Sequence, residues 1–416
     1  MKILLVPMGT PGDVQPFIDL GLELQSRGHG AQLVAHANFA AWVRQFGLPF
    51  VELGPAEQYE RLLADRNLWN VHKSPRVFAK KLVLPTMRPL YELIRKAAED
   101  GPVIVVAQTM ALGARVAHDR LGVPLVTVHR QPAVVRSLRD SPVIPYFAFG
   151  RFVPKTIKRL EYRLIDAALD HTYGPKLNAF RGELGLPPVK RIVGHWMHSP
   201  DAVLGFWPEW FASPQPDWPA NMQLVGFDVQ TRGEKPPPAS LVEFLDKGEK
   251  PIVFTVGSGM QHGRAFYEAS AKACERIGRR GVLITRKADQ VPSHLPPTVL
   301  HAEYAPFNWL LPRCAAVVHH AGIGTLVQSL AAGIPQLAMP GVVFDTPDNA
   351  RRLERLGAGM VITQRKYLSG GAAEALERLL ADSQIAARAR ALAERMRADN
   401  AIARAADVIE QVANRR

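Results

Sequence analysis

The stretch 317–340 reads VVHHAGIGTLVQSLAAGIPQLAMP. A short apolar run ends in two histidines, a Gly-x-Gly-Thr turn follows, and a helical pattern leads into a second apolar run ending in proline. This strand–turn–helix–strand order predicts part of a parallel sheet with helices on its faces. The turn then lies at the carboxyl end of a strand, where open parallel sheets bind ligands.

The same alternation begins at the first residues. Residues 2–8 (KILLVPM) form a continuous apolar run, as expected for a strand buried on both faces. After the turn GTPGD, residues 14–29 have helical spacing, with Phe17, Leu20 and Leu24 on one face. Further strand-like runs recur between helical patterns in both halves of the chain. The fold class is therefore predicted to be α/β, with two Rossmann-like βα domains.

Composition places the boundary between these domains. Residues 228–240 (DVQTRGEKPPPAS) are polar and rich in proline, as linkers are. We predict an N-terminal domain over 1–227, a linker over 228–245 and a C-terminal domain over 246–395. The last helical stretch, 396–416, is long enough to return to the first domain.

The bulk composition limits the class of protein. With 416 residues, 47% hydrophobic and 21% charged, the chain is expected to form two globular domains. No apolar run approaches the roughly 18–20 residues that span a bilayer. The two cysteines have no metal or disulfide spacing, which indicates a reducing cytoplasm. The formal net charge of +13 suits an anionic partner, but the basic residues are scattered and resemble no nucleic-acid-binding module.

Two glycine turns in the C-terminal half suit a phosphate group. A helix N-terminus offers unpaired N–H groups and a partial positive charge, and a neighbouring histidine can donate a hydrogen bond. Such groups occur at 320–325 and again at Gly257, Ser258 and Gly259. A single turn of this kind is more simply explained as a tight βα connection with structural histidines. Two such turns in one domain make a shared phosphate site more plausible than either turn alone does.

The N-terminal turn GTPGDVQP carries one carboxylate, Asp13. A carboxylate at the end of a strand could accept a proton from a hydroxyl nucleophile. An equally good structural use is that of N-cap for a helix beginning at Val14. The stretch 141–170 is aromatic and basic and then amphipathic. It could form the wall of an apolar acceptor pocket, a covering helix, or a membrane-docking surface.

In these motifs the chain resembles family 1 glycosyltransferases with the GT-B architecture, in which two Rossmann-like domains face each other across a cleft. The resemblance covers nearly the whole chain and is carried by MGTPGDVQPFIDLGLELQSRGH, VFTVGSG, YAPFNWLLPRCAAVVHHAGIGT and FDTPDNARRLERLG. The branch includes bacterial sterol-type, antibiotic-aglycone and rhamnolipid-forming enzymes. HWMHSP and WFASPQPDWP lean toward the rhamnolipid-forming rhamnosyltransferases.

The resemblance implies a role for each matching residue. Asp13 takes the place of the base that activates the acceptor hydroxyl. The donor diphosphate is expected to bind His320, Gly322, Gly324, Thr325, Gly257 and Ser258. Tyr304 is expected to stack on the nucleobase, Phe307 to lie beside its edge, and Gln328 to hold the ribose. Asp345 and Thr346 are expected to hold the sugar hydroxyls.

Two departures from the family pattern bear on the donor. Gln328 stands where plant-type relatives have a ribose-binding glutamate, and Thr346 replaces the glutamine of glucose-using relatives. An amide binds a diol less strongly than a carboxylate does, and threonine lacks the amide donor. The resemblance therefore favours dTDP-rhamnose over UDP-glucose. It implies no metal requirement, because the histidine, hydroxyls and helix dipole replace the cation. His29, His129, His195 and His198 are expected to be structural.

The sequence thus predicts an inverting hexosyltransferase acting on a hydrophobic acceptor such as a hydroxyalkanoyl lipid. We expect it in the cytoplasm, with a possible peripheral contact with the inner membrane and no nucleic-acid partner. A UDP-glucose-dependent sterol-type or small-aglycone glucosyltransferase is the alternative. A GT-B nucleotide-sugar epimerase and a non-catalytic lipid-binding relative also remain open, and the oligomeric state is not predicted.

Overall fold

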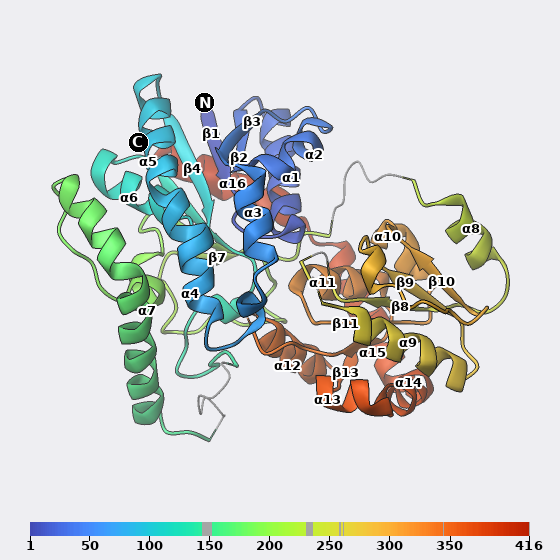
Figure 1. Cartoon of the computed structure of the whole chain (residues 1–416). Helices are drawn as coiled ribbons and strands as arrows, with labels where there is room; N and C mark the ends of the chain where they lie inside the picture. The colour runs from blue at the N-terminus through green and yellow to red at the C-terminus, as the bar shows by residue number, and fades with distance from the viewer. Residues whose placement is uncertain (144–151, 230–235, 258, 261, 344, 416) are drawn as a thin grey trace. The chain divides into compact units, whose positions relative to one another are not determined.

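The computed structural model describes the chain except residues 144–151, 230–235, 258, 261, 344 and 416 (Figure 1). The chain divides into two compact units. Unit 1 is Met1–Asp228 together with Asn400–Arg416, and unit 2 is Val229–Asp399. Each unit has its own parallel sheet, so the predicted pair of Rossmann-like α/β domains is confirmed.

The sheet of unit 1 has seven strands in the order β3-β2-β1-β4-β5-β6-β7. All of its pairings are parallel, with Leu4 opposite Val105 across β1 and β4. The strands are β1 (Lys2–Val6), β2 (Gly30–His36), β3 (Phe50–Gly54), β4 (Val103–Gln108), β5 (Leu125–His129), β6 (Ala202–Gly205) and β7 (Met222–Leu224). The α-helices of this unit are α1 (Pro11–Ser26), α2 (Ala40–Arg44), α3 (Ala56–Leu63), α4 (Ser74–Phe78), α5 (Leu84–Glu99), α6 (Leu112–Leu121), α7 (Lys155–Glu183) and α16 (Ala401–Asn414).

The sheet of unit 2 has six parallel strands in the order β10-β9-β8-β11-β12-β13. They are β8 (Ile252–Thr255), β9 (Gly281–Ile284), β10 (Val299–Ala302), β11 (Ala316–His319), β12 (Gln336–Ala338) and β13 (Gly359–Val361). The helices are α8 (Ala239–Asp246), α9 (Arg264–Arg276), α10 (Phe307–Leu310), α11 (Ile323–Ala332), α12 (Thr346–Leu356), α13 (Gln364–Lys366), α14 (Ala372–Ala381) and α15 (Ser383–Arg397).

In both sheets the strand order reverses direction at one point. In unit 1 the chain leaves β1 toward β3 and returns on the other side at β4. In unit 2 it leaves β8 toward β10 and returns at β11. The loops that follow the two central strands diverge at such a switch point, which leaves a crevice for a ligand. The predicted site residues after β1, β8 and β11 therefore lie at the switch points of their sheets.

Two predicted boundaries were wrong. The first helix begins at Pro11 and not at Val14, because Thr10 is its N-cap and proline favours the first helical position. The linker predicted over 228–245 contains most of α8, which follows the three prolines 236–238. Leu241 of α8 is fully buried in the core of unit 2. A proline-rich composition therefore marked the start of a helix as well as the end of a unit.

The end of the chain belongs to unit 1. Ile402 and Ile409 of α16 lie in the same buried cluster as Phe17 and Leu24 of α1. Arg27 donates hydrogen bonds to the carboxylates of Asp407 (2.6 Å) and Glu410 (2.9 Å), and His29 contacts Glu410 at 2.9 Å. His29 thus has a structural partner. Among the described residues, no helix is both long and apolar enough to cross a membrane.

Candidate active site

Both carboxylate oxygens of Asp13 accept hydrogen bonds from neighbouring residues, which fix the orientation of the side chain. Its Oδ2 accepts hydrogen bonds from the Thr10 amide (2.8 Å) and the Thr10 hydroxyl (3.1 Å), and its Oδ1 accepts one from Gln108 Nε2 (2.8 Å). The Oε1 of Gln108 in turn accepts the Met8 amide at 2.9 Å. A carboxylate has about four lone-pair positions, so three donors leave room for roughly one more. The remaining position suits a substrate hydroxyl.

The close fit around Asp13 also explains Gly9. Its φ of +142° favours glycine, and a Cβ there would lie 2.3 Å from Asp13 Oδ2. The structural alternative for Asp13 was partly right: Asp13 does cap the helix, but from the third helical position and not as the N-cap. This capping box leaves the carboxylate half-buried at the carboxyl end of β1.

Two neighbouring buried polar side chains, Tyr59 and His36, were not predicted. Burial, and to a lesser degree the charge of Asp13, raises the pKa of the Tyr59 phenol on α3. Burial also lowers the pKa of His36, at the end of β2, to about 4. Tyr59 Oη and His36 Nε2 have no hydrogen-bond partner among the described residues. Neither residue lies in a motif, so this pair could not be predicted from the sequence.

A chain of hydrogen bonds follows the carboxyl ends of β4 and β5. The Thr109 hydroxyl contacts His129 Nδ1 at 2.8 Å, and His129 Nε2 contacts His198 Nδ1 at 2.9 Å. Burial lowers the pKa of both imidazoles, that of His198 to about 4, so both rings are neutral near pH 7. The structure thus gives His129 and His198 partners within the protein. Gln108 is the last residue of β4 and Thr109 follows it, so Gln108 reaches Asp13 while Thr109 reaches His129.

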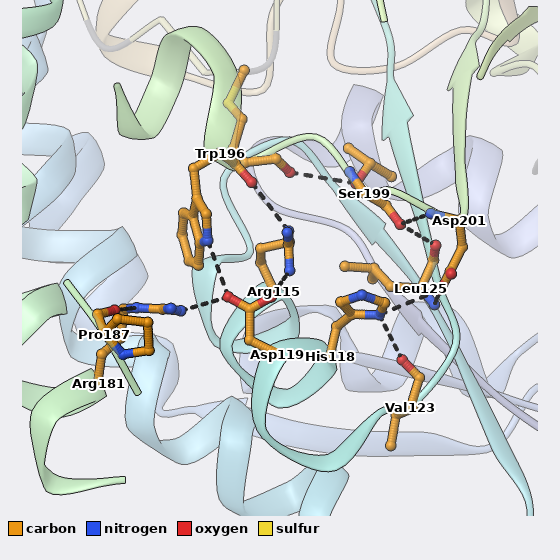
Figure 2. Close-up of polar contacts among 12 residues, drawn as sticks. Arg115, His118, Asp119, Val123, Leu125, Arg181, Pro187, Trp196, Ser199 and Asp201 are labelled. Carbon is orange, nitrogen blue, oxygen red and sulfur yellow. Dashed lines mark hydrogen bonds and ion pairs between the residues drawn. The ribbon is translucent and has the colours of Figure 1, made fainter. Parts of the chain in front are cut away.

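The segment that carries His198 is fixed to the rest of unit 1 by the network in Figure 2. Asp119 on α6 accepts hydrogen bonds from Arg115, Arg181 and the Trp196 indole. Arg115 also donates to the Trp196 carbonyl at 3.1 Å. Further along, the Ser199 hydroxyl donates to the Leu125 carbonyl, and the Leu125 amide donates to Asp201. The HWMHSP motif is therefore anchored between α6, α7 and β5.

In unit 2, His320 lies between two glycines. A Cβ on Gly257 would come within 2.4 Å of His320 Cε1, and a Cβ on Gly322 within 2.4 Å of His320 Nε2. The φ of Gly257 is +80°, which also favours glycine. The structure thus brings the turns after β8 and β11 together around one imidazole. Ser258 lies outside the described residues.

The two adjacent histidines have different roles. His319 is fully buried, accepts the Ala321 amide on Nδ1 (3.0 Å) and contacts Gln336 Oε1 with Nε2 (2.9 Å). Both of its nitrogens are therefore used within the protein. His320 is half-buried, and its Nδ1 has no partner among the described residues. Burial lowers the pKa of His320 to about 4, so the free protein offers a neutral imidazole to a ligand at pH 7.

The N-terminus of α11 follows directly. Gly322 is its N-cap, and Gly324 and Thr325 occupy its first turn and are half-buried. A Cβ on Gly324 would have open space around it, so the backbone there can be approached. Ala321, just before the helix, has a φ of +64°, which is rare for a residue other than glycine. Its carbonyl accepts a hydrogen bond from Asn349 of α12 at 3.0 Å. The helix presents its positive end beside His320.

The two predicted sugar-binding residues differ in accessibility. Asp345 is half-buried, is the N-cap of α12, and accepts a hydrogen bond from Asn349 at 2.5 Å. Thr346 is only 7% exposed, and its hydroxyl donates to the Val343 carbonyl at 3.1 Å. Asn349 links Asp345 to Ala321 and was not predicted, although it follows Asp345 at helical spacing. Asp345 remains the better candidate for a sugar contact.

The predicted nucleobase and ribose residues lie on separate elements. Tyr304 follows β10, Phe307 begins α10, and Gln328 lies on α11; all three are half-buried. The Arg286 guanidinium lies over the Tyr304 ring, 5.6 Å from its centroid. Arg286 was not predicted, and a flat cation beside this ring could also contact a base or a phosphate. In the described part of the chain, no three His, Cys, Asp or Glu side chains are grouped as metal ligands.

Comparison with known families gives two matches that fall on different units. Residues 3–137 match the glycosyltransferase family 28 N-terminal domain. Residues 280–412 match the C-terminal domain of the erythromycin biosynthesis protein CIII-like (EryCIII-like) family. The first match contains Asp13, and the second contains His320 and the start of α11.

Two curated relatives align along the whole chain. The O-mycaminosyltylonolide 6-deoxyallosyltransferase of Streptomyces fradiae is 29% identical over 440 positions, covering 100% of this chain and 98% of that protein. A sterol 3-beta-glucosyltransferase of Arabidopsis thaliana is 27% identical, covering 97% of this chain and 64% of that protein.

Solved structures agree on the fold. The kitacinnamycin glycosyltransferase superposes with a TM-score of 0.75 at 22% identity, covering 99% of this chain and 98% of that one. The spinosyn rhamnosyltransferase SpnG, solved with thymidine diphosphate, gives 0.66 at 20% identity, covering 97% and 98%. The chain is a glycosyltransferase: its N-terminal part is similar to the family 28 N-terminal domain and its C-terminal part to the EryCIII-like C-terminal domain, and its two Rossmann-like units have GT-B enzymes as structural neighbours.

Proposed function

We propose that the protein transfers a hexose, preferably rhamnose, from a nucleoside-diphosphate sugar to a hydroxyl of a hydrophobic acceptor such as a hydroxyalkanoyl lipid. The observation that carries this proposal is the half-buried imidazole of His320, enclosed by Gly257 and Gly322 at the positive end of α11. These groups suit a diphosphate. Unit 1 supplies a carboxylate, Asp13, with about one lone-pair position left for a hydroxyl.

The proposed reaction is a single displacement with inversion. Asp13 accepts the proton of the acceptor hydroxyl, and the oxygen attacks the anomeric carbon of the donor sugar. The bond from that carbon to the diphosphate oxygen breaks, and the electron pair leaves with the diphosphate. The first-turn amides of α11, the Thr325 hydroxyl and His320 stabilise the developing charge. Ser258 is proposed to contribute a further hydroxyl.

We also propose that transfer needs no metal ion. The helix end and the neutral imidazole provide partial positive charge and hydrogen-bond donors where a cation would otherwise balance the diphosphate. The expected result is full activity after dialysis against EDTA. Activity that disappears on dialysis and returns with Mg²⁺ or Mn²⁺ would contradict this part of the proposal.

Two observations support a deoxy-sugar donor bound to thymidine diphosphate. The Thr346 hydroxyl is turned to the Val343 carbonyl, so Asp345 is the more accessible of the two predicted sugar contacts. In addition, the Streptomyces fradiae relative is named as a 6-deoxyallosyltransferase, and SpnG was solved with thymidine diphosphate. We propose that Tyr304 stacks on the base and that Gln328 holds the ribose.

A UDP-glucose-dependent transfer to a sterol or another small aglycone is the second candidate. It is favoured by the likeness to the sterol 3-beta-glucosyltransferase, which extends over 97% of this chain. The two candidates share the diphosphate site and differ in the sugar and the base. They also share a proposed cytoplasmic location, supported by the free, buried thiols of Cys274 and Cys314, and a peripheral contact with the inner membrane.

The experiment that separates them is a binding panel. Purified protein is titrated calorimetrically with dTDP, UDP, GDP, dTDP-rhamnose and UDP-glucose, with the His320→Ala variant as control. The proposal predicts that dTDP-rhamnose binds at least tenfold more tightly than UDP-glucose. The variant should bind all of them more weakly. Tighter binding of UDP-glucose would select the second candidate, and no binding of any nucleotide would contradict both.

A further inference from the structure

We propose that the N-terminal part of α7, together with Phe152 three residues before it, forms a docking surface for an anionic membrane. Eight large hydrophobic side chains are exposed in the described chain, and four of them lie within residues 152–164. Phe152 is 94% exposed, Leu164 58%, Leu160 57% and Ile157 46%. Such side chains gathered on one face of a helix mark an interaction site, because an exposed apolar patch is costly in water. We call these four side chains the α7 stripe.

Three members of the α7 stripe lie on one face of the helix, whose other face is attached to unit 1; the fourth, Phe152, precedes the helix. Ile157, Leu160 and Leu164 have the spacing i, i+3, i+7, which places them side by side. The buried residues between them, Lys158 and Tyr162, point the other way. Lys158 Nζ donates to the Leu138 carbonyl, and Tyr162 Oη to the Ser137 carbonyl.

A third contact, between Arg136 and Asp166, ties the next turn of α7 to the same segment. The outward direction of the stripe is therefore fixed by contacts within unit 1. This surface position also argues against the expectation that these three side chains form the wall of an acceptor pocket.

The charged side chains around the α7 stripe indicate that an anionic membrane is its binding partner. Lys155, Arg159 and Arg163 are exposed on the same turns, and none of the exposed residues in 152–164 is acidic. Basic side chains beside an apolar helix face are typical of helices that lie in a membrane interface and bind anionic headgroups. A second copy of the chain would bring the same cations together, which opposes self-association through this face. A neutral bilayer would leave the cations without partners.

This inference rests on the proposed function, which includes a peripheral contact with the inner membrane. It names the surface through which the protein makes that contact. A hydrophobic acceptor that partitions into a bilayer would be concentrated where the enzyme docks. Membrane binding and nucleotide binding are separate measurements, since the nucleotide groups lie in unit 2 and the α7 stripe in unit 1. A failure of the membrane proposal therefore leaves the glycosyltransferase proposal standing, and the reverse also holds.

The test is flotation of the full chain with vesicles of phosphatidylcholine alone or mixed with phosphatidylglycerol. We expect binding to the mixed vesicles, at least tenfold weaker binding to phosphatidylcholine, and loss of much of the binding in high salt. The triple variant Ile157→Ser, Leu160→Ser, Leu164→Ser should bind mixed vesicles at least tenfold more weakly. The matched control is Leu121→Ser with Leu368→Ser, two leucines exposed by 37% and 39% elsewhere, which should bind normally.

A second pair of variants tests the charges. Arg159→Gln with Arg163→Gln should weaken binding to mixed vesicles severalfold, whereas Arg378→Gln with Arg388→Gln, two exposed arginines of unit 2, should not. All variants should melt normally and bind dTDP as the parent does, because the substituted side chains are exposed.

Three results would overturn the proposal. The first is equal binding to both kinds of vesicle or to neither. The second is unchanged binding of the triple variant. The third is a dimer in light scattering that the triple variant abolishes, which would show that a second copy covers the α7 stripe.

Discussion

Gly257 shows how a single missing side chain shapes the candidate site. Its Cα faces the His320 ring so closely that a methyl group would overlap it, and its φ is positive. We therefore expect Gly257→Ala to displace the imidazole and to weaken dTDP binding by at least tenfold. The affinity is measured by calorimetry.

Gly278 offers a matched control for this substitution. It lies in the same unit and has a φ of +63°, but a Cβ there would have no neighbour within 4 Å. Gly278→Ala introduces comparable backbone strain, about 1–2 kcal/mol, without touching His320. It should lower the melting temperature and leave dTDP affinity unchanged. Equal loss of affinity in both variants would show that strain, and not the contact with His320, is responsible.

His36 gives a pH dependence of stability. Burial lowers its pKa from 6.5 to about 4, so the folded form takes up a proton less readily than the unfolded chain. The stability that this group contributes is complete above about pH 6.5 and is lost as the pH falls toward 4. At pH 5 the loss from one such histidine is about 2 kcal/mol.

The measurement is urea unfolding of the parent and of His36→Met at pH 7 and pH 5. Six of the seven tryptophans lie in unit 1, so their fluorescence follows the unit that contains His36. Between the two pH values the parent should lose about 2 kcal/mol more stability than the variant. Identical pH dependence of the two proteins would mean that His36 does not remain neutral in the folded state.

At the scale of single elements, the Asp119 network fixes the HWMHSP segment (Figure 2). Burial acts to raise the pKa of Asp119, but Arg115, Arg181 and Trp196 together hold it below its usual value. Removing the carboxylate leaves two arginines without their common partner. We expect Asp119→Ala to lower the free energy of unfolding of unit 1 by about 3 kcal/mol. Tryptophan fluorescence in urea measures this.

The control for that prediction is Asp65→Ala. Asp65 is also ion-paired, with Lys81 at 2.8 Å, but it accepts from one cation and not from two. Unlike Asp119, it is the N-cap of a short helix, Arg66–Trp69. Its loss should cost about 1 kcal/mol. Comparable effects of the two substitutions would contradict the central position of Asp119 in the network.

The elements also show which features the sequence could predict. Strands such as 2–6 and 316–319 were predictable because both faces of a parallel sheet are buried, which gives continuous apolar runs. The start of α1 was missed because Thr10 and Pro11 were taken for a loop, although both residues favour a helix start. The α8 helix was missed because its preceding prolines suggested a linker.

Some features of the candidate site were likewise predictable from the sequence, and others were not. The position of Asp13 and His320 at a sheet edge was predictable, because the chain order places both in turns that follow strands. Gln108, Asn349 and Arg286 were missed because their roles depend on contacts between segments far apart in the sequence. No local pattern records that Gln108 lies 2.8 Å from Asp13, or that Arg286 faces the Tyr304 ring.

At the scale of the whole molecule, the two ends of the chain stabilise one unit. Ile409 of α16 is fully buried against the cluster that contains Phe17 of α1. We expect Ile409→Ala to lower the free energy of unfolding of unit 1 by about 2–4 kcal/mol. Nucleotide binding by unit 2 should be unchanged. A large loss of dTDP affinity in folded Ile409→Ala would contradict this separation of roles.

We propose that unit 1 supplies the base and unit 2 the diphosphate site of one transfer reaction. The most direct test measures dTDP affinity and the rate of sugar transfer in Asp13→Ala and His320→Ala side by side. We predict that Asp13→Ala keeps its dTDP affinity within about twofold and loses at least about 100-fold in transfer. His320→Ala should lose both affinity and transfer. Near-normal turnover by Asp13→Ala, or unaltered dTDP binding by His320→Ala, would contradict this division of roles between the two units.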